Sequence, residues 1–554
     1  MKERFTNLKR DELLKPLPNT HYDLIVIGGG ITGAGILLDA ASRGLKTLLL
    51  EKGDFASGTS SKSTKLIHGG LRYLKQFDFW LVKEVGSERA IVHQLAPHLV
   101  LPEKMLLPLI EHGSYGKWLT SIGLKVYDIL AQVEGDDQRR MLEKDEAMEK
   151  EPLLPDTPLK GAGYYAEYRS DDARLTLENI KKALEYDATA INYMKVSEFL
   201  YQEEQVCGVI GRDELTKKEI KINGSYVINA AGPWVDELRS LNRSKKGKQL
   251  HLTKGVHLVF PYEKLPVKQS VYFDVPDGRM IFAIPRGRIT YVGTTDTNYN
   301  DNKDDIHTDV ADAIYLISAV NNMFPKINLE MEDIISSWAG LRPLIHEEGK
   351  SPSELSRKDE IFTSDSGLIS IAGGKLTGYR KMAERVVNRV TEKFKEQHDK
   401  TFSACITEKI ALCGGPWKGG YKEVQEYEHK IHNLLTGDKF DLHDARYLVH
   451  TYGKQTEEIL EIYNNITTGE PEERMIRAEF DFCARKEMIL NPFDFFIRRT
   501  GRMYFQIESV RKHMGIILKD YGVKFGADPS TLEDMAADLE HAIEEHSNFS
   551  FDRV

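Results

Sequence analysis

The sequence lacks a long hydrophobic run. Its most apolar stretch, residues 99–110, contains two prolines and two charged residues, and it is shorter than the ~20 apolar residues that a membrane-spanning helix needs. The first 20 residues carry basic side chains but no continuous apolar core of the kind found in signal peptides. We therefore expect a cytoplasmic protein that at most lies on a membrane surface.

Cysteine is scarce as well, and there is no excess of positive charge. The net charge is −10, which gives no overall attraction to nucleic acid, so we expect no nucleic-acid partner. No pair of cysteines has the CxxC spacing of zinc sites, and nothing indicates a disulfide framework. We therefore expect buried thiols and no bound metal. The four cysteines are Cys207, Cys405, Cys413 and Cys483.

What the chain does have is length and an ordinary globular composition. It contains 554 residues, of which 41% are hydrophobic and 29% charged. A chain of this length is too long for one core, so we expect two or three packed units. A large ligand can then bind between the units.

A strand, a glycine-rich turn and a helix follow one another near the N-terminus. Residues 23–27 (DLIVI) form a short apolar run typical of a strand that is buried on both faces of a parallel sheet. Residues 34–42 favour a helix, and residues 47–51 (TLLLE) favour a second strand. Together these segments predict a βαβ unit of a Rossmann-like α/β domain.

The turn of this unit carries the pattern GxGxxG, which is weak evidence unless a strand and a helix flank it. Gly28 permits the tight turn, Gly30 lets the backbone approach a pyrophosphate, and Gly33 lets helix and strand pack closely. Thr32 belongs to the same turn, where the helix N-terminus attracts phosphate. Glu51 ends the next strand, where a carboxylate can bind a ribose and disfavours NADP, so FAD or NAD is expected. A solvated carboxylate is the alternative for Glu51.

Later segments define the predicted domains. The runs YVINAAG (226–232) and LISIAGG (368–374) are typical of buried strands returning to the first sheet. The alternating stretches RMIFAIP (279–285) and RITYVG (288–293) indicate an antiparallel sheet, and the pattern is helical from about 441 to 545. We predict an α/β (overall α+β) fold with three parts: a dinucleotide-binding domain at 20–100, 165–250 and 335–395, a substrate-binding domain at 101–164 and 251–334, and a C-terminal helical domain at 400–554.

One segment is hard to explain as ordinary surface. Residues 57–74, SGTSSKSTKLIHGGLRYL, are rich in hydroxyl groups and glycine. The segment resembles the signature of the FAD-dependent glycerol-3-phosphate dehydrogenases, whose fold is that of the D-amino-acid-oxidase-like flavoproteins. Further motifs similar to that family follow in the family's order: NAAGPWVD, KGVHLV, YVGTTDT, WAGLRPL, SRKDEI and AGGKLTGYRKMAE.

The resemblance implies a non-covalently bound FAD. Residues 373–377 precede a helix that begins near Tyr379, and its N-terminus would face the pyrimidine edge of the flavin. For the cofactor residues between Ser60 and Trp234 named below, the alternative is ordinary loop hydroxyls and strand ends. Besides the glycine turn and Glu51, the resemblance places these residues at FAD: Ser60, Ser61, Lys65, Leu66, His68, Gly69, Val196, Ala230, Gly232, Trp234, Gly374, Lys375, Leu376 and Thr377.

The resemblance also implies oxidation of sn-glycerol 3-phosphate to dihydroxyacetone phosphate. Arginine suits a phosphate group because its planar fork forms two parallel bonds. Arg342 and Arg357 lie in motifs that supply such arginines in the family. Arg72, Tyr73 and Lys375 correspond to further substrate contacts. Taken singly, each charged residue would more often form a surface ion pair.

Oxidation of the alcohol needs a base for the hydroxyl proton while hydride leaves for flavin N5. His257 in KGVHLV is the first candidate, because histidine titrates near neutral pH. His68 is the second candidate, and Arg342 completes the predicted catalytic set. A structural role is the alternative for either histidine.

The electron acceptor is the least defined feature. The family divides between dehydrogenases that reduce a membrane quinone and oxidases that reduce oxygen to hydrogen peroxide. The oxidases are longer through an insertion that this chain lacks, so we expect a quinone-linked enzyme peripherally associated with the inner face of the cell membrane. Residues 1–14 either contact anionic lipid or form a solvated tail. A homodimer, an NAD-dependent dehydrogenase and a flavin-binding redox sensor all stay open.

Overall fold

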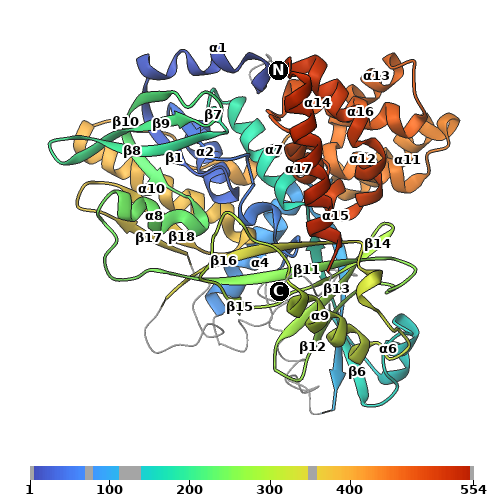
Figure 1. The fold of residues 1–554 in the computed structure, drawn as a ribbon. Coiled ribbons are helices and arrows are strands. Elements are labelled where there is room, and N and C mark those ends of the chain that lie inside the picture. The colour runs from blue at the N-terminus through green and yellow to red at the C-terminus, as the bar shows by residue number, and fades with distance from the viewer. Residues whose placement is uncertain (1–4, 69–78, 112–138, 347–358, 550–554) are drawn as a thin grey trace.

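The computed structural model describes residues 5–68, 79–111, 139–346 and 359–549 (Figure 1). The predicted βαβ unit is present, with β1 (His21–Ile27) and β2 (Thr47–Leu50) as parallel neighbours and α2 (Ile31–Ser42) between them in sequence. On its other side β1 pairs in parallel with β10 (Glu219–Asn229). The predicted parallel sheet around the glycine turn is therefore confirmed.

The first sheet runs in the order β17–β18–β10–β1–β2–β7. Leu24 and Val26 of β1 pack in the core that contains α2, while Ile25 and Ile27 pack with residues of β8 and β9. Because alternate residues of a strand face opposite sides, β1 is buried on both faces, as its unbroken apolar sequence predicts. Two further helices, α7 and α10, pack against α2. The bounds are β7 (Thr189–Ile191), β8 (Met194–Gln202), β9 (Gln205–Asp213), β17 (Asp359–Thr363), β18 (Ile369–Gly373), α7 (Asp172–Leu184) and α10 (Tyr379–His398).

A second, mainly antiparallel sheet runs in the order β15–β11–β14–β13–β12–β4–β6–β3, with β16 paired to β11 and β5 to β6. The predicted antiparallel stretches form the neighbours β13 and β14, so that prediction is confirmed. The bounds are β3 (Leu66–Ile67), β4 (Leu101–Ile110), β5 (Arg140–Leu142), β6 (Leu159–Arg169), β11 (Leu250–Pro261), β12 (Ser270–Asp274), β13 (Met280–Arg286), β14 (Ile289–Gly293), β15 (Thr297–Asn298) and β16 (Ser336–Ile345).

The pairing of two strands does not follow the predicted division into domains. The segments 20–100 and 335–395, predicted to be dinucleotide-binding, contain β3 and β16, but β3 pairs with β6 and β16 pairs with β11 in the second sheet. The partners are distant in sequence, so no local pattern shows the pairing. As a result, chain segments that enter the first sheet also supply strands to the second.

The C-terminal part is helical, as predicted. Local caps start several of its helices; the Asp441 side chain, for example, accepts the backbone N–H groups of His443 and Asp444 at the start of α12. Its elements are α11 (Gly420–Leu435), α12 (Leu442–Tyr452), α13 (Thr456–Asn465), α14 (Pro471–Lys486), the π-helix η12 (Asp494–Arg499), α15 (Arg502–Phe505), α16 (Ile507–Phe525) and α17 (Pro529–Ser547). Elsewhere lie α1 (Arg10–Leu14), α4 (Phe79–Leu95), α6 (Lys144–Lys150), α8 (Val235–Leu241) and α9 (Val310–Met323).

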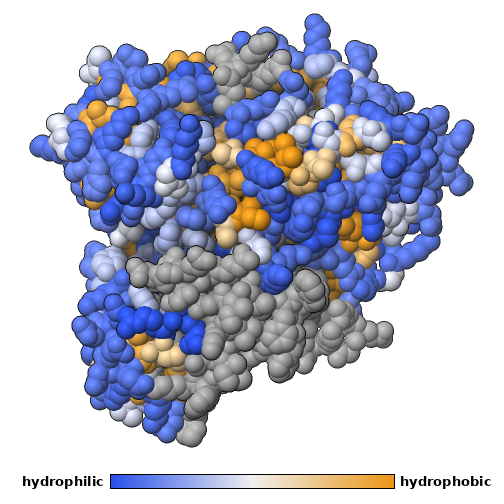
Figure 2. Space-filling model, turned by 180° about the vertical axis from the view of Figure 1, so that it is seen from behind, coloured by the Kyte–Doolittle hydropathy of each residue, from blue (hydrophilic) through white to orange (hydrophobic). Residues whose placement is uncertain are grey.

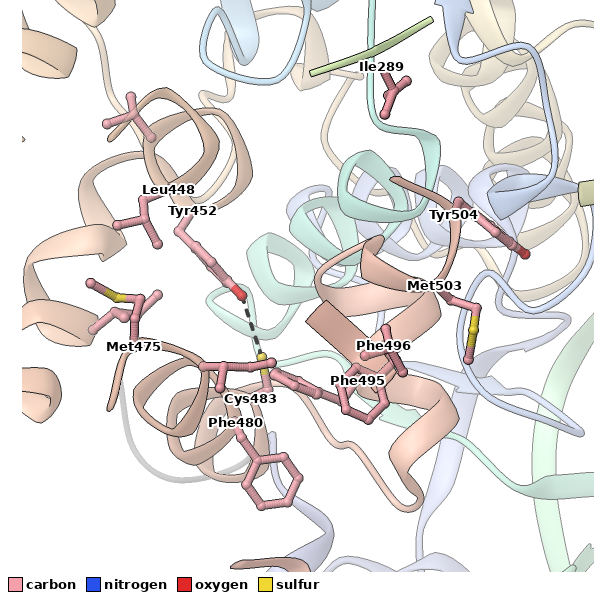
Figure 3. Close-up of a cluster of buried hydrophobic side chains, with 14 of the residues drawn as sticks. Ile289, Leu448, Tyr452, Met475, Phe480, Cys483, Phe495, Phe496, Met503 and Tyr504 are labelled. Atoms are coloured by element: carbon pink, nitrogen blue, oxygen red, sulfur yellow. Dashed lines mark hydrogen bonds between the residues drawn. The ribbon is translucent and has the colours of Figure 1, made fainter. Parts of the chain in front are cut away.

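The C-terminal helices share a hydrophobic core with the second sheet. Figure 3 shows Tyr452 of α12, Cys483 of α14 and Phe495 of η12 in one cluster, to which Ile289 of β14 also belongs. The Tyr452 hydroxyl lies 3.9 Å from Cys483 Sγ. Because these side chains are buried in one continuous cluster, the helical domain is packed onto the rest of the protein.

The surface is largely hydrophilic on the face shown in Figure 2, where hydrophobic residues gather in a small area near the centre. Across the residues described, no helix is both long and apolar enough to cross a membrane. Most of the apolar stretch at residues 99–110 forms strand β4.

Candidate functional site

A cavity opens at the carboxyl ends of the parallel strands in the first sheet. Gly28 follows β1, Glu51 follows β2 and Gly374 follows β18, and all three line the cavity. The opposite wall includes His257 of β11 and Arg342 of β16 in the second sheet. The carboxyl edge of an open α/β sheet is where such folds bind their ligands.

The glycine turn brings backbone close to backbone. Gly28 has a φ of +113°, and a Cβ there would lie 2.5 Å from a carbonyl oxygen of the turn after β10. A Cβ on Gly33 would lie 1.9 Å from the Gly28 carbonyl oxygen, so α2 packs directly on the turn. Gly30 is the N-cap of α2 but has no side chain to cap the helix. Ser60 Oγ instead accepts the Ile31 N–H at 2.9 Å. The helix N-terminus thus lies at the cavity with backbone N–H groups suited to phosphate.

Glu51 is held by backbone groups. Its Oε2 accepts the Gly29 N–H at 2.6 Å and its Oε1 accepts the Gly53 N–H at 2.8 Å. Burial raises the pKa of the Glu51 carboxyl, while these two N–H groups oppose the rise. Since only 9% of Glu51 is exposed, the alternative of a solvated carboxylate is excluded. The oxygens keep lone pairs that can accept from a ligand hydroxyl.

The turn after β18 forms another part of the wall. Gly373 and Gly374 both have positive φ values, 75° and 80°, which glycine adopts without strain. Lys375 then precedes a single 3₁₀ turn, and α10 begins at Tyr379. Thr377 Oγ1 donates to the His68 carbonyl oxygen at 3.4 Å, which connects this turn to the loop after β3.

His257 is buried against aromatic side chains. Its ring is stacked on Trp338, with 4.7 Å between ring centroids, and its Nε2 lies 3.0 Å from Thr64 Oγ1. Nδ1 is buried and has no hydrogen-bond partner among the described residues. Burial lowers the pKa of His257 well below its usual value, and the positive charges of Arg342 and Lys65 lower it further. The imidazole is therefore neutral at physiological pH and can accept a proton.

Arg342 lies beside His257 on the second sheet, and its guanidinium is held in a defined place. Nη1 donates to the Thr295 carbonyl oxygen at 3.1 Å and lies 3.2 Å from Asp296 Oδ1, while Nη2 donates to Thr294 Oγ1 at 2.8 Å. A Cβ on Gly255 would lie 2.3 Å from Nη2, so any larger residue there would force this guanidinium to move. The side chain is 22% exposed and faces the cavity.

The cavity brings together most of the predicted site residues. Gly69, Arg72, Tyr73 and Arg357 lie outside the described residues. The predicted residues that line the cavity are Gly28, Gly30, Thr32, Glu51, Ser60, Leu66, His68, Val196, Ala230, Gly232, Trp234, His257, Arg342, Gly374, Lys375, Leu376 and Thr377.

Three residues predicted at the cofactor are not among those that line the cavity, namely Gly33, Ser61 and Lys65. Gly33 lies under the turn. The Lys65 ammonium instead donates to Asp172 Oδ1 at 2.5 Å and to the Ser61 carbonyl oxygen at 3.0 Å. This pair fixes the loop to the start of α7, and the sequence gives no sign of it because the partners are 107 residues apart.

Two family models match the chain. The model described as "FAD dependent oxidoreductase" matches residues 23–380, and the model described as "C-terminal domain of alpha-glycerophosphate oxidase" matches residues 405–531. The first covers more than half of the chain. The chain belongs to the FAD-dependent oxidoreductase family.

Relatives of this FAD-dependent oxidoreductase match it over nearly its whole length. The aerobic glycerol-3-phosphate dehydrogenase of Bacillus subtilis is 49% identical over 95% of both chains, and that of Staphylococcus aureus strain USA300 is 47% identical over 98% of both. Among solved structures, the glycerol-3-phosphate dehydrogenase from Bacillus halodurans complexed with FAD is 41% identical and covers 99% of both chains with a TM-score of 0.84. The L-alpha-glycerophosphate oxidase from Mycoplasma pneumoniae shares the fold, with 18% identity and a TM-score of 0.55 over 70% of this chain and 96% of its own.

FAD is the cofactor of this oxidoreductase, and the cavity fits it. The glycine turn leaves backbone surface bare, the N-terminus of α2 faces the cavity, and Glu51 offers a buried acceptor to a ribose. Trp234 Nε1 is buried without a hydrogen-bond partner among the described residues, and the Lys52 ammonium lies 4.0 Å from the Trp234 ring centroid. These groups suit a long anionic dinucleotide.

Sequence reasoning missed several residues of the site. Thr64 and Trp338 position His257, and Lys62 also lines the cavity. Burial and, to a smaller extent, the nearby positive charge of Arg498 lower the pKa of Lys62 to about 8. Trp338 stands in the WAGLRPL motif and Lys62 in the hydroxyl-rich segment, so the sequence indicated the motifs but not the part that these two residues play in the site. Their positions relative to His257 and the cavity depend on the pairing of the second sheet.

Proposed function

We propose that this enzyme oxidises sn-glycerol 3-phosphate to dihydroxyacetone phosphate and passes the electrons to a membrane quinone. The observation that carries the proposal is the single cavity in which a dinucleotide-type turn faces a neutral buried imidazole and an arginine. Such a cavity combines a place for FAD, a proton acceptor and a phosphate-binding group. The full-length relatives named as glycerol-3-phosphate dehydrogenases support the same substrate.

In this proposal the first sheet binds FAD. The α2 N-terminus and Ser60 contact the diphosphate, Glu51 binds the adenosine ribose, and Val196 packs near the adenine. The turn at Gly374–Thr377 presents backbone N–H groups to the pyrimidine edge, where negative charge develops on reduction. When bound, FAD supplies the acceptor for the hydride that leaves carbon 2 of the substrate.

The second sheet binds the substrate phosphate. Arg342 is held by Thr294, Thr295 and Asp296 at its Nη atoms, so its guanidinium is already oriented before the substrate binds. Lys375 adds a second positive charge at the cavity. Arg72, Tyr73 and Arg357 remain predicted substrate contacts.

His257 takes the hydroxyl proton of the substrate. The C–H bond at carbon 2 breaks with its electron pair, the O–H bond breaks toward the imidazole, and a carbonyl group forms. His257 can accept the proton because the lowered pKa keeps it neutral, and the Trp338 stack fixes the plane of the ring. His68 lines the same cavity and is the second candidate for this role.

Anaerobic reduction tests the substrate assignment. Addition of sn-glycerol 3-phosphate to the oxidised holoenzyme should remove the absorbance of oxidised flavin and form dihydroxyacetone phosphate in equal amount. Glycerol at the same concentration is the control, because it offers the same alcohol without phosphate. Flavin that stays oxidised with sn-glycerol 3-phosphate refutes the proposal.

The electron acceptor has a second candidate. The C-terminal match to a domain of alpha-glycerophosphate oxidase favours oxygen, with hydrogen peroxide as the product. The quinone proposal is supported by the dehydrogenase names of the long relatives and includes peripheral binding to the inner face of the cell membrane. Mixing the reduced enzyme with a quinone analogue or with oxygen in a stopped-flow instrument decides between them, since the physiological acceptor should reoxidise the flavin much faster than the other one.

A further inference from the structure

The loop after β2 connects the cavity to the C-terminal domain. Glu51 begins the loop and lines the cavity, whereas Asp54, three residues later, is buried on the far side. Asp54 Oδ1 and Oδ2 accept two parallel bonds from Arg499 of η12, at 2.8 and 2.6 Å. Arg498 Nε donates to Asp54 Oδ2 at 2.5 Å as well. Two arginines from the helical domain thus bind one aspartate of the dinucleotide-binding domain.

Arg499 is held firmly on its own side. It is fully buried, and its Nε and Nη2 donate to the Glu487 carbonyl oxygen at 3.0 and 2.7 Å. Arg498 is paired with Asp494 at 2.6 Å. Because a guanidinium with its donors in use has little freedom to move, Asp54 is fixed relative to the helical domain. The two guanidinium groups hold the pKa of Asp54 below its usual value despite its burial.

The same loop reaches Glu51 through short bonds. Gly53 donates its N–H to Glu51 Oε1 at 2.8 Å, and the Gly53 carbonyl oxygen accepts the Tyr193 N–H at 2.8 Å. Ala56 donates its N–H to the Gly29 carbonyl oxygen at 3.0 Å, within the glycine turn. A shift of Asp54 would therefore move the groups that orient the Glu51 carboxylate.

Asn192 closes the junction from the β7–β8 turn. Its Nδ2 donates to Asp54 Oδ1 at 3.1 Å and to the Met488 carbonyl oxygen at 2.9 Å. Figure 1 shows α7 running between the dinucleotide-binding domain and the C-terminal helices, and η12 packs against it. The helical domain thus meets the dinucleotide-binding domain directly behind the cofactor loop.

We propose that Arg499 is a positioning residue for FAD: through Asp54 it sets the place of the Glu51 carboxylate, so the C-terminal helical domain is part of the cofactor-binding apparatus. This inference rests on the proposed contact between Glu51 and the adenosine ribose. Arg499 is not among the residues that line the cavity. Loss of the Arg499–Asp54 pair should weaken FAD binding at the ribose and leave the chemistry of bound FAD intact.

The experiment measures FAD affinity by titrating apoprotein with FAD and with an FAD analogue that lacks the adenosine 2′-hydroxyl. Asp54→Asn keeps the size and the bond from Asn192 but removes the charge, and Arg499→Lys keeps the charge but cannot form the fork. Each variant should bind FAD at least tenfold more weakly than the wild type, and its preference for FAD over the analogue should fall toward one. At saturating FAD the kcat should return to near the wild-type value.

Arg502→Lys is the matched control, because Arg502 forms a similarly buried pair with Glu479 inside the helical domain, 2.5 Å apart and without a hydrogen bond to the loop. It should lower stability in urea but leave the FAD affinity and the FAD preference unchanged. The inference is overturned if Asp54→Asn and Arg499→Lys keep the wild-type preference, or if Arg502→Lys reduces it equally. Failure of the proposed reaction would show separately, as wild-type holoenzyme that sn-glycerol 3-phosphate does not reduce.

Discussion

Replacing His257 by asparagine tests the proposed base directly. Asparagine is polar and similar in length, but it cannot take up a proton in this pH range. A positioned proton acceptor contributes about 10²–10⁴ to the rate, or about 2.7–5.4 kcal/mol at 1.36 kcal/mol for each factor of ten. We expect flavin reduction by substrate to slow by this factor, while reoxidation keeps its rate. Anaerobic stopped-flow absorbance measures the reductive step alone.

The same proposal also predicts how the rate of flavin reduction changes with pH. Protonated imidazole cannot accept a proton, so the wild-type reduction rate should fall as the pH drops through the pKa of His257. Burial, Arg342 and Lys65 hold that pKa well below 6.5, so the rate should be flat near neutral pH and decline only in the acid range. An unperturbed histidine would instead give the decline near pH 6.5. In the His257→Asn enzyme this acid limb should be absent.

His68→Asn is the comparison, since His68 lines the same cavity. If the His257 variant reduces its flavin at the wild-type rate, or if the acid limb survives in it, His257 is not the base. Loss of the limb in the His68 variant with FAD still bound would then assign the role to His68.

Three further substitutions test other parts of the site. Gly30→Val should abolish FAD incorporation, because a Cβ there would lie 3.0 Å from Ser60 Oγ and the rest of the side chain would fill the space proposed for the diphosphate. Purified variant protein that is yellow would contradict this. Arg342→Lys should lower kcat/KM for sn-glycerol 3-phosphate at least tenfold with an unchanged flavin spectrum, since a point charge cannot replace the two parallel bonds of a guanidinium. An equal proportional loss with glycerol would show that Arg342 does not bind the phosphate. Gly255→Ala should raise the KM for sn-glycerol 3-phosphate more than it lowers kcat, because its Cβ would lie 2.3 Å from Arg342 Nη2; steady-state kinetics with an unchanged KM would contradict the placement of that arginine.

The parts of the fold that can be predicted from the sequence are those that depend on residues close together in the chain. The βαβ unit follows from an unbroken apolar run, a glycine turn and a helix-forming stretch, each within about a dozen residues of the next. The β13–β14 pair follows from alternation on either side of a short turn. The strands β3 and β16 lie in segments predicted to be dinucleotide-binding but pair with β6 and β11 of the second sheet, and the sequences of these strands carry no local pattern that identifies their partners.

The candidate site follows the same rule. Gly28 and Glu51 stand at the ends of predicted strands, so the topology alone brings them to one edge of the sheet. Lys65 was predicted at the cofactor by its motif, yet a buried carboxylate on α7 draws its ammonium away from the cavity. The Asp54–Arg499 pair joins residues 445 positions apart, and neither residue belongs to a motif with a recognised ligand role. Long-range ion pairs of this kind leave no local pattern.

The proposed reaction makes two opposing demands on the cavity, since a phosphate dianion needs positive charge nearby while a base needs to be neutral. In the proposed mechanism the same groups meet both demands. Arg342 faces the cavity and is the proposed phosphate-binding group, and its charge, with that of Lys65, disfavours a positive charge on His257. The Trp338 ring covers one face of the imidazole and keeps water away from it, so the influence of those charges is not weakened by solvent. In the proposed mechanism, the charges that attract the phosphate therefore also keep the imidazole neutral and able to accept the proton.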